Sequence, residues 1–281
     1  MPHDGWDPAQ YERFRAERSQ PFHDLLAMVV PRAGMRVVDL GSGTGDLTLL
    51  LHERLRARET VGIDRSPAML EKAATLAGGG LKFQRGEIAE FAEESAYDLV
   101  FSNSALHWVP DHPALFRRLA RALRPGGQVA VQMPDMYHHP SHLVAVEVGQ
   151  EFQEELAGYT HREYVLEPPE YKAVLSSLGF TQQKVEIRFY DYELGSREDV
   201  VEWVKGALLV QYKERMSPDA YERYLARYRE RVMPRLEDTR PYIYSYRRIL
   251  IWGKLGERGK VVEINAQRRS VSRRKAVKGS A

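Results

Sequence analysis

The stretch VVDLGSGTG (37–45) places a tight glycine turn between an apolar run and a leucine-striped helix. Gly41, Gly43 and Gly45 permit backbone angles that other residues avoid, and they let the main chain approach a ligand closely. In open α/β sheets, such a turn at the carboxyl end of a strand normally receives a nucleotide-like ligand. The turn therefore predicts an α/β fold and leaves open which ligand it holds.

The segment from 36 to 132 alternates short apolar runs with stretches of helical periodicity. The apolar runs are rich in β-branched and aromatic residues, which is typical of strands. Strands and helices that alternate at this spacing predict a doubly wound, parallel sheet. The predicted strands are 36–40, 59–64, 81–86, 97–103 and 128–133.

The pattern changes after residue 134. Residues 141–157 and 198–233 have the composition of helices, whereas 184–194 and 247–255 have that of strands. We expect these two distant strands to pair antiparallel and to complete the sheet, and the helices between them to form a lid.

The chain has 281 residues, enough for one large α/β domain with an insertion or for two modest domains. No run approaches the roughly 18 to 20 apolar residues that span a bilayer, and the N-terminus lacks a secretory pattern. The absence of cysteine excludes disulfides and thiolate chemistry. We expect a cytoplasmic protein.

The basic residues are concentrated at the C-terminus, where residues 254–281 hold nine Lys or Arg and two Glu. One interpretation is a weak, salt-sensitive attraction to nucleic acid or to an anionic membrane. The other, which we favour, is a solvated and disordered extension, because the segment has no apolar periodicity. We accordingly expect no nucleic-acid partner.

Charge and spacing discriminate among the ligands of the glycine turn. The dinucleotide fingerprint has its third glycine where this chain has Asp46, and the Gly-Lys-Ser/Thr ending of a phosphate-binding loop is absent. Asp39 precedes the turn, and two carboxylates would repel a pyrophosphate. S-adenosylmethionine (SAM) carries a cationic sulfonium and an ammonium, so acidic surroundings suit it. We therefore predict SAM over a nicotinamide dinucleotide.

A second carboxylate supports an adenosine-type ligand. Asp64 ends the next predicted strand, where it can accept hydrogen bonds from both hydroxyls of a ribose. The alternative is that Asp64 only caps the helix that begins at SPAML (66–70). Glu87, or the backbone N–H of Ile88, follows the third strand and could contact the adenine edge.

Five stretches together resemble the class I SAM-dependent methyltransferases and, more narrowly, the trans-aconitate methyltransferase group. They are VVDLGSGTG, GIDRSPAML, FQRGEI, DLVFSNSALHWVPDH and LRPGGQVAVQMPD, and WDPAQYERFRAERSQPFHDLL at the N-terminus is similar too. The resemblance implies a Rossmann-like, seven-strand sheet with one antiparallel strand, with SAM as the cofactor. The SAM-binding residues implied are Tyr11, Arg18, Asp39, Gly41, Ser42, Gly43, Gly45, Asp64, Arg65, Met69, Glu87, Ile88, Asn103 and Trp108.

The resemblance also implies a domain organisation. Residues 1–30 form an N-terminal helical cap and 31–135 a SAM-binding core. Residues 136–256 supply the remaining strands and a helical substrate lid, and 257–281 form the basic tail.

The lid departs from the family. The group's Arg-Pro pair is Leu209-Val210 in this chain, and an arginine fork is a natural grip for a carboxylate. The resemblance therefore implies the fold and the cofactor but not a tricarboxylate substrate. Arg248 and Lys205 remain as candidate cations.

Methyl transfer is an in-line displacement, so alignment and exclusion of water matter most. A carboxylate acceptor needs no base, whereas a hydroxyl or an amine can require one. His107 is the candidate base, or alternatively a residue that lines the pocket. The histidines at 138, 139 and 142 predict a polar pocket loop, and we expect no metal. The candidate substrate residues are Trp6, His107, Trp108, Tyr137, Trp203 and Arg248.

We therefore expect a methyltransferase for a small molecule, acting on a carboxylate or a hydroxyl oxygen, as a monomer or a weak dimer. The alternatives are N- or C-methylation of a small metabolite, and methylation of nucleic acid or protein through the basic tail.

Overall fold

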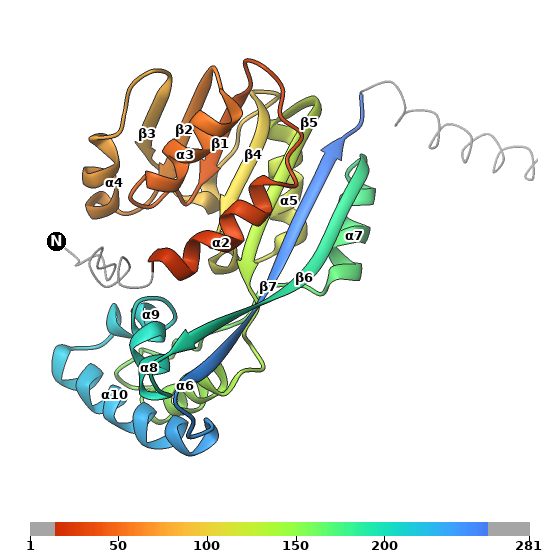
Figure 1. Cartoon of the computed structure of the whole chain (residues 1–281). Coiled ribbons are helices and arrows are strands. Elements are labelled where there is room, and N and C mark those ends of the chain that lie inside the picture. The colour runs from red at the N-terminus through yellow and green to blue at the C-terminus, as the bar shows by residue number, and fades with distance from the viewer. Residues whose placement is uncertain (1–14, 258–281) are drawn as a thin grey trace, which may run out of the picture.

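The computed structural model describes residues 15–257, with side chains from residue 19 onward. Seven strands form one sheet in the order β3-β2-β1-β4-β5-β7-β6 (Figure 1). The inner strands are parallel, and β7 is antiparallel to both of its neighbours. This arrangement confirms the predicted fold class. The strands are β1 (Arg36–Leu40), β2 (Glu59–Asp64), β3 (Leu81–Arg85), β4 (Tyr97–Asn103), β5 (Leu123–Pro134), β6 (Phe180–Leu194) and β7 (Tyr242–Leu255).

Helices cover both faces of the sheet, which explains why the central strands are apolar without alternation. On β1, Val37 packs with α2 (Arg15–Leu26) and α3 (Asp46–Leu55) on one face. The next residue, Val38, packs with α5 (His112–Ala122) and α7 (Pro168–Ser177) on the other. Successive strand residues point to opposite faces, so a buried run serves both layers.

The region 198–233 is three helices rather than the one that its composition predicts. They are α8 (Glu198–Lys205), α9 (Val210–Lys213) and α10 (Pro218–Val232). Gly206 follows α8, and Ser217 begins α10 by accepting a hydrogen bond from the Ala220 N–H. A serine cap followed by proline is a strong start signal inside an otherwise continuous amphipathic stretch.

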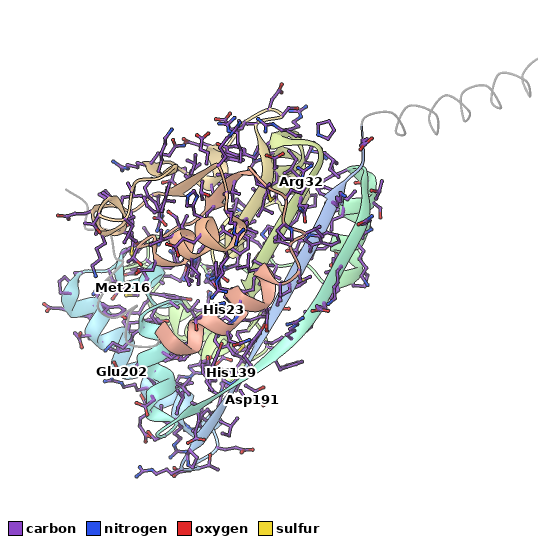
Figure 2. The ribbon with its side chains drawn as sticks, turned by 45° about the horizontal axis from the view of Figure 1, so that its top comes forward. His23, Arg32, His139, Asp191, Glu202 and Met216 are labelled. Carbon is purple, nitrogen blue, oxygen red and sulfur yellow. The ribbon has the colours of Figure 1, made fainter. Side chains whose placement is uncertain are left out.

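The strands β6 and β7 run well beyond the rest of the sheet, and α8, α9, α10 and α6 (Pro140–Glu151) pack at their far ends as a lid (Figure 1). Both strands begin before the predicted segments, at Phe180 and Tyr242. Figure 2 shows Asp191 on the far part of β6, and Glu202 and Met216 on the lid. The predicted antiparallel pairing of these strands is confirmed.

The lid has an aromatic core of its own. Tyr224 and Tyr228 of α10 are buried and donate hydrogen bonds to the carbonyl oxygens of Ala145 and Ser141 in α6. Their helical spacing therefore serves packing.

Within residues 15–257, every helix is too short or too polar to cross a bilayer.

Candidate active site

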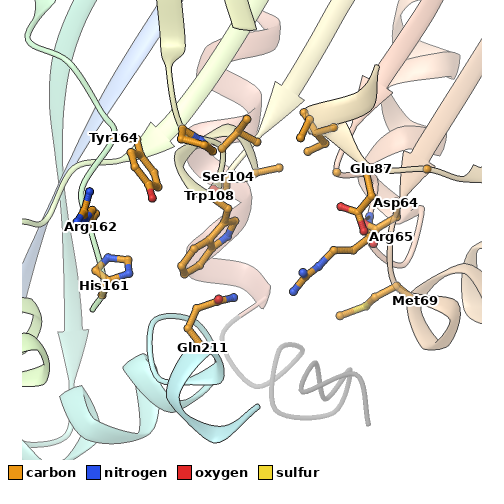
Figure 3. Close-up of a pocket in the computed structure, with 18 of the residues that line it drawn as sticks. Asp64, Arg65, Met69, Glu87, Ser104, Trp108, His161, Arg162, Tyr164 and Gln211 are labelled. Atoms are coloured by element: carbon orange, nitrogen blue, oxygen red, sulfur yellow. Dashed lines mark hydrogen bonds between the residues drawn. The ribbon is translucent and has the colours of Figure 1, made fainter. Parts of the chain in front are cut away.

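A cavity of about 380 Å³ opens at the carboxyl ends of the parallel strands, between the sheet and the lid (Figure 3). Open α/β sheets bind their ligands at this edge. The core side of the cavity is lined by Gly41, Gly43, Asp64, Arg65, Met69, Gly86, Glu87, Ile88, Ala89, Asn103, Ser104, Ala105, Trp108, Val109 and Pro110. The lid side is lined by Tyr159, His161, Arg162, Tyr164, Gln211 and Arg215.

The three glycines of the turn serve different purposes. All three have positive φ angles, between 56° and 83°. A Cβ on Gly41 would lie 2.2 Å from the Cβ of Ala105, and one on Gly45 would lie 2.7 Å from the Phe83 ring. A Cβ on Gly43 would meet no protein atom within 4 Å. Gly41 and Gly45 therefore let neighbouring elements pack closely, whereas Gly43 faces the space where a ligand lies.

Asp64 joins the end of β2 to the glycine turn. Its carboxylate accepts hydrogen bonds from the Gly43 N–H at 2.8 Å and the Ser66 N–H at 2.9 Å. Ser66, not Asp64, caps α4 (Pro67–Ala74), because its Oγ accepts from the Met69 N–H. Asp64 lines the cavity, and a carboxylate has lone pairs left to accept from the hydroxyls of a ribose.

The two aspartates that flank the turn in sequence do not line the cavity. Asp39 is buried and accepts a hydrogen bond from Thr48 Oγ1 at 2.6 Å, and burial raises its pKa to about 7. Asp46 accepts from Thr44 Oγ1 at 2.8 Å. Among the described residues, the acidic lining of the cavity comes instead from Asp64 and Glu87.

The end of β4 supplies polar groups to the middle of the cavity. Asn103 Oδ1 is buried and has no hydrogen-bond partner among the described residues. Ser104 has a left-handed backbone (φ 58°) and hydrogen-bonds Gln132 through its Oγ. The Asn103 oxygen lacks a hydrogen-bond donor, and an ammonium group, such as that of SAM, is a suitable one. These groups fit the resemblance, which places Asn103 and Trp108 beside the methionine half of SAM.

The lid side of the cavity is basic and aromatic. The Arg215 guanidinium lies 4.0 Å from the centre of the Tyr159 ring. Arg65 reaches across from the core to Glu214 at 3.4 Å. Over residues 19–257, no carboxylate lies within ion-pair distance of Arg162, which is exposed to the cavity.

Sequence reasoning missed the lining residues between 159 and 164, because residues 158–167 have no periodicity that assigns them to an element. The helix predicted over 141–157 ends earlier, at Glu151. The signal available was GYTHREYV (158–165), which mixes aromatic with basic residues.

His107 lies behind Trp108 and faces a second, smaller cavity rather than the main one. Burial lowers its pKa well below the usual value, and its Nδ1 has no hydrogen-bond partner within the described part of the chain. The imidazole is therefore neutral at pH 7 and a weak base. His139 caps α6, and no cluster of residues suited to a metal occurs among residues 15–257.

Several other predicted residues lie elsewhere. Trp203 is buried in the lid and stacks on Tyr192 at 4.8 Å, so it is a packing residue. Tyr137 is 41% exposed and lines neither cavity. Arg248 is buried beneath Ser104. Ser42 and Gly45 pack behind the turn. Outside the described residues or side chains are Trp6, Tyr11, Arg18 and the tail from 258 to 281.

Comparison with known proteins agrees with this geometry. A protein-family profile described as a methyltransferase domain matches residues 31–183. A trans-aconitate 2-methyltransferase of Deinococcus radiodurans is 38% identical over 251 residues, which are 87% of this chain and 96% of that protein. One from Methylobacterium nodulans is 40% identical over 228 residues, covering 79% and 87%.

The chain belongs to the class I SAM-dependent methyltransferases.

Solved structures share the fold at low identity. The YcgJ protein of Bacillus subtilis aligns with a TM-score of 0.54 and 16% identity, over 84% of this chain and 98% of that one. A Haemonchus contortus phosphoethanolamine N-methyltransferase 2, complexed with S-adenosylhomocysteine, aligns with a TM-score of 0.51 and 18% identity, over 85% and 53%. Membership of the methyltransferase family, rather than these structures, gives SAM as the methyl donor of this protein.

Proposed function

We propose that this methyltransferase esterifies a carboxylate of a small polycarboxylic acid. The observation that carries the proposal is the distribution of charge across the cavity. Asp64 and Glu87 lie on one side together with Arg65, which pairs with Glu214, and Arg162 lies on the other side, with Trp108 between them (Figure 3). An acidic half suits a sulfonium donor, and a basic half suits an anionic acceptor.

The core residues hold the donor. Asp64 would accept hydrogen bonds from the ribose, Glu87 and the Ile88 N–H would contact the adenine, and Asn103 would accept from the ammonium group. When bound, SAM supplies an electrophilic methyl group. The protein aligns the acceptor oxygen with that methyl and excludes water with Trp108 and the lid.

Among the described side chains that line the main cavity, the imidazole is that of His161, and burial lowers its pKa to about 4, so a carboxylate acceptor is favoured over a hydroxyl or an amine. A carboxylate is already anionic at pH 7 and attacks without losing a proton. His107 has a lowered pKa and lies outside the main cavity, behind Trp108. We therefore assign it no proton-transfer role.

The substitution of the family's Arg-Pro pair does not remove positive charge from this cavity. Leu209 and Val210 are buried in the lid, and neither of them lines the cavity. Gln211 and Arg215, which follow them, line the cavity together with Arg162. The names of the relatives make trans-aconitate the first acceptor to test.

The test is a screen of polycarboxylates, phenols and amines with SAM, read by product mass and by lability to mild alkali. We expect alkali-labile methyl esters of di- or tricarboxylic acids. Stable products formed from phenols or amines, with no ester, would refute the proposal.

A further inference from the structure

A second cavity lies behind Trp108, on the side away from the SAM-binding turn. Its volume is about 40 Å³, which is room for two or three waters or for one carboxylate group. Trp108 and His161 line both cavities, so the two cavities adjoin at these side chains. His107, His142 and Glu163 supply further polar groups of its lining.

A buried cation lies next to this cavity. Arg248 is 3% exposed, and its guanidinium lies 4.5 Å from the ring centre of Tyr246, which lines the cavity. One of its nitrogens donates to Ser104 Oγ at 3.1 Å, and its Nε has no hydrogen-bond partner among the described side chains. Between residues 19 and 257, no carboxylate comes within ion-pair distance of it. A buried charge without a counter-ion is costly, so a bound anion would stabilise this arrangement.

The other titratable groups of the cavity do not supply that anion. Burial, together with nearby Asp135, raises the pKa of Glu163 to about 7, so about half of this carboxyl is neutral at pH 7. Burial lowers the pKa of His142 to about 3 and of His161 to about 4. His107 is neutral for the same reason. The Arg248 guanidinium therefore carries a full positive charge, and it lies beside a cavity whose hydrogen-bonding groups are wholly or partly uncharged.

We propose that the cavity behind Trp108 is a second anion subsite, which holds a carboxylate of the acceptor other than the one that is methylated. Arg248 supplies the charge, and the neutral histidines supply N–H donors. The choice of a polycarboxylate rests on the proposed function. The subsite itself would bind an unreactive dicarboxylate as well.

The test measures binding to the full-length protein saturated with S-adenosylhomocysteine, by calorimetry. The probes are trans-aconitate and the C4 to C6 dicarboxylates, each compared with its monoamide. We expect at least one diacid to bind tenfold or more tightly than its monoamide. In Arg248→Gln this preference falls to less than threefold, because the diacid loses affinity and the monoamide does not.

Two further variants isolate the cavity. Ala207→Leu fills it without changing charge, and we expect the same loss of preference. Lys254→Gln, on the same strand as Arg248, should keep the preference for the diacid. Arg248→Gln should melt no lower than the wild type, because it removes a buried unpaired charge. If that variant does not fold, Ala207→Leu decides the question.

The subsite is refuted if the wild type shows no diacid preference, or if the preference survives in both Arg248→Gln and Ala207→Leu. Arg248-dependent binding of diacids by a protein that forms no methyl ester would refute the proposed reaction and keep the subsite. If the protein forms methyl esters but binds a diacid and its monoamide with equal affinity, the subsite is refuted and the proposed reaction is kept.

Discussion

The two halves of the cavity are built in different ways. The core half comes from the carboxyl ends of adjacent parallel strands, and its residues belong to short, contiguous motifs. The lid half comes from residues 159–164 and 211–215, which meet only because β6 and β7 carry the lid back over the sheet. The core half is acidic and the lid half basic. A donor site can thus be kept while the acceptor site changes.

The largest expected effect distinguishes a tryptophan that packs inside the lid from one that lines the cavity. Trp203→Ala should lower the free energy of unfolding by about 3 to 5 kcal/mol, because Trp203 is a fully buried, stacked side chain. Trp108→Ala should cost clearly less stability but abolish most turnover, since Trp108 is partly exposed in the cavity. Chemical denaturation measures the free energy of unfolding of the two variants, and an activity assay measures the turnover. Equal destabilisation by the two variants would contradict this assignment.

The second effect concerns the core half alone. Asp64→Ala should weaken SAM binding about 100-fold, roughly 2.7 kcal/mol, because the carboxylate both orders the Gly43 N–H and accepts from the ribose. Calorimetry with SAM measures the loss. Asp46→Ala is the matched control, since Asp46 flanks the same turn outside the cavity lining and should keep SAM affinity within about threefold. Unchanged affinity in Asp64→Ala would reject the ribose assignment.

The third effect concerns the lid half alone. Arg162→Gln should raise the KM of a carboxylate acceptor about tenfold, roughly 1.4 kcal/mol, and leave the Kd of SAM unchanged. Steady-state kinetics with the acceptor found by the screen gives the first value, and calorimetry the second. Arg229→Gln, on the outer side of the lid beside Glu202, is the control. A rise in the Kd of SAM would show that the two halves are not separable.

The smallest effect concerns the ion pair that joins the halves. Arg65 and Glu214 are 3.4 Å apart, and the Arg65 side chain is 46% exposed. Such pairs contribute at most about 1 kcal/mol, so Arg65→Gln should change either KM by less than about fivefold. The change should shrink further in high salt, because exposed charges are screened. A larger, salt-independent loss would instead favour direct contact of Arg65 with the cofactor.

The glycine turn shows how far local sequence reaches. Its strand, its helix and its exposure to a ligand follow from residues 37–51, because each depends on near neighbours in the chain. Which carboxylates line the cavity does not follow from these residues. Asp39 and Asp46 appeared equivalent to Asp64, yet Asp39 is turned under the sheet edge toward Thr48. Only the packing of strands against helices determines which side of the chain faces the cavity.

The tryptophans make the same point for the lid. Trp108 and Trp203 were both predicted to contact the acceptor, although only Trp108 was also predicted to contact SAM. Trp108 follows a strand at the open edge of the sheet, whereas Trp203 lies on the face of α8 that packs against β6. Burial of a large aromatic side chain depends on what lies opposite it, which periodicity does not report.

By itself, the sequence determined the seven-strand fold, the glycine turn and the methyl donor, because alternating periodicity and contiguous strand-end motifs are local properties. The tertiary structure alone brought Arg162 and Arg215 to the cavity. They come from distant segments, and they converge only when the long pairing of β6 with β7 positions the lid above the sheet. Chain connectivity carries no local signal for such convergence.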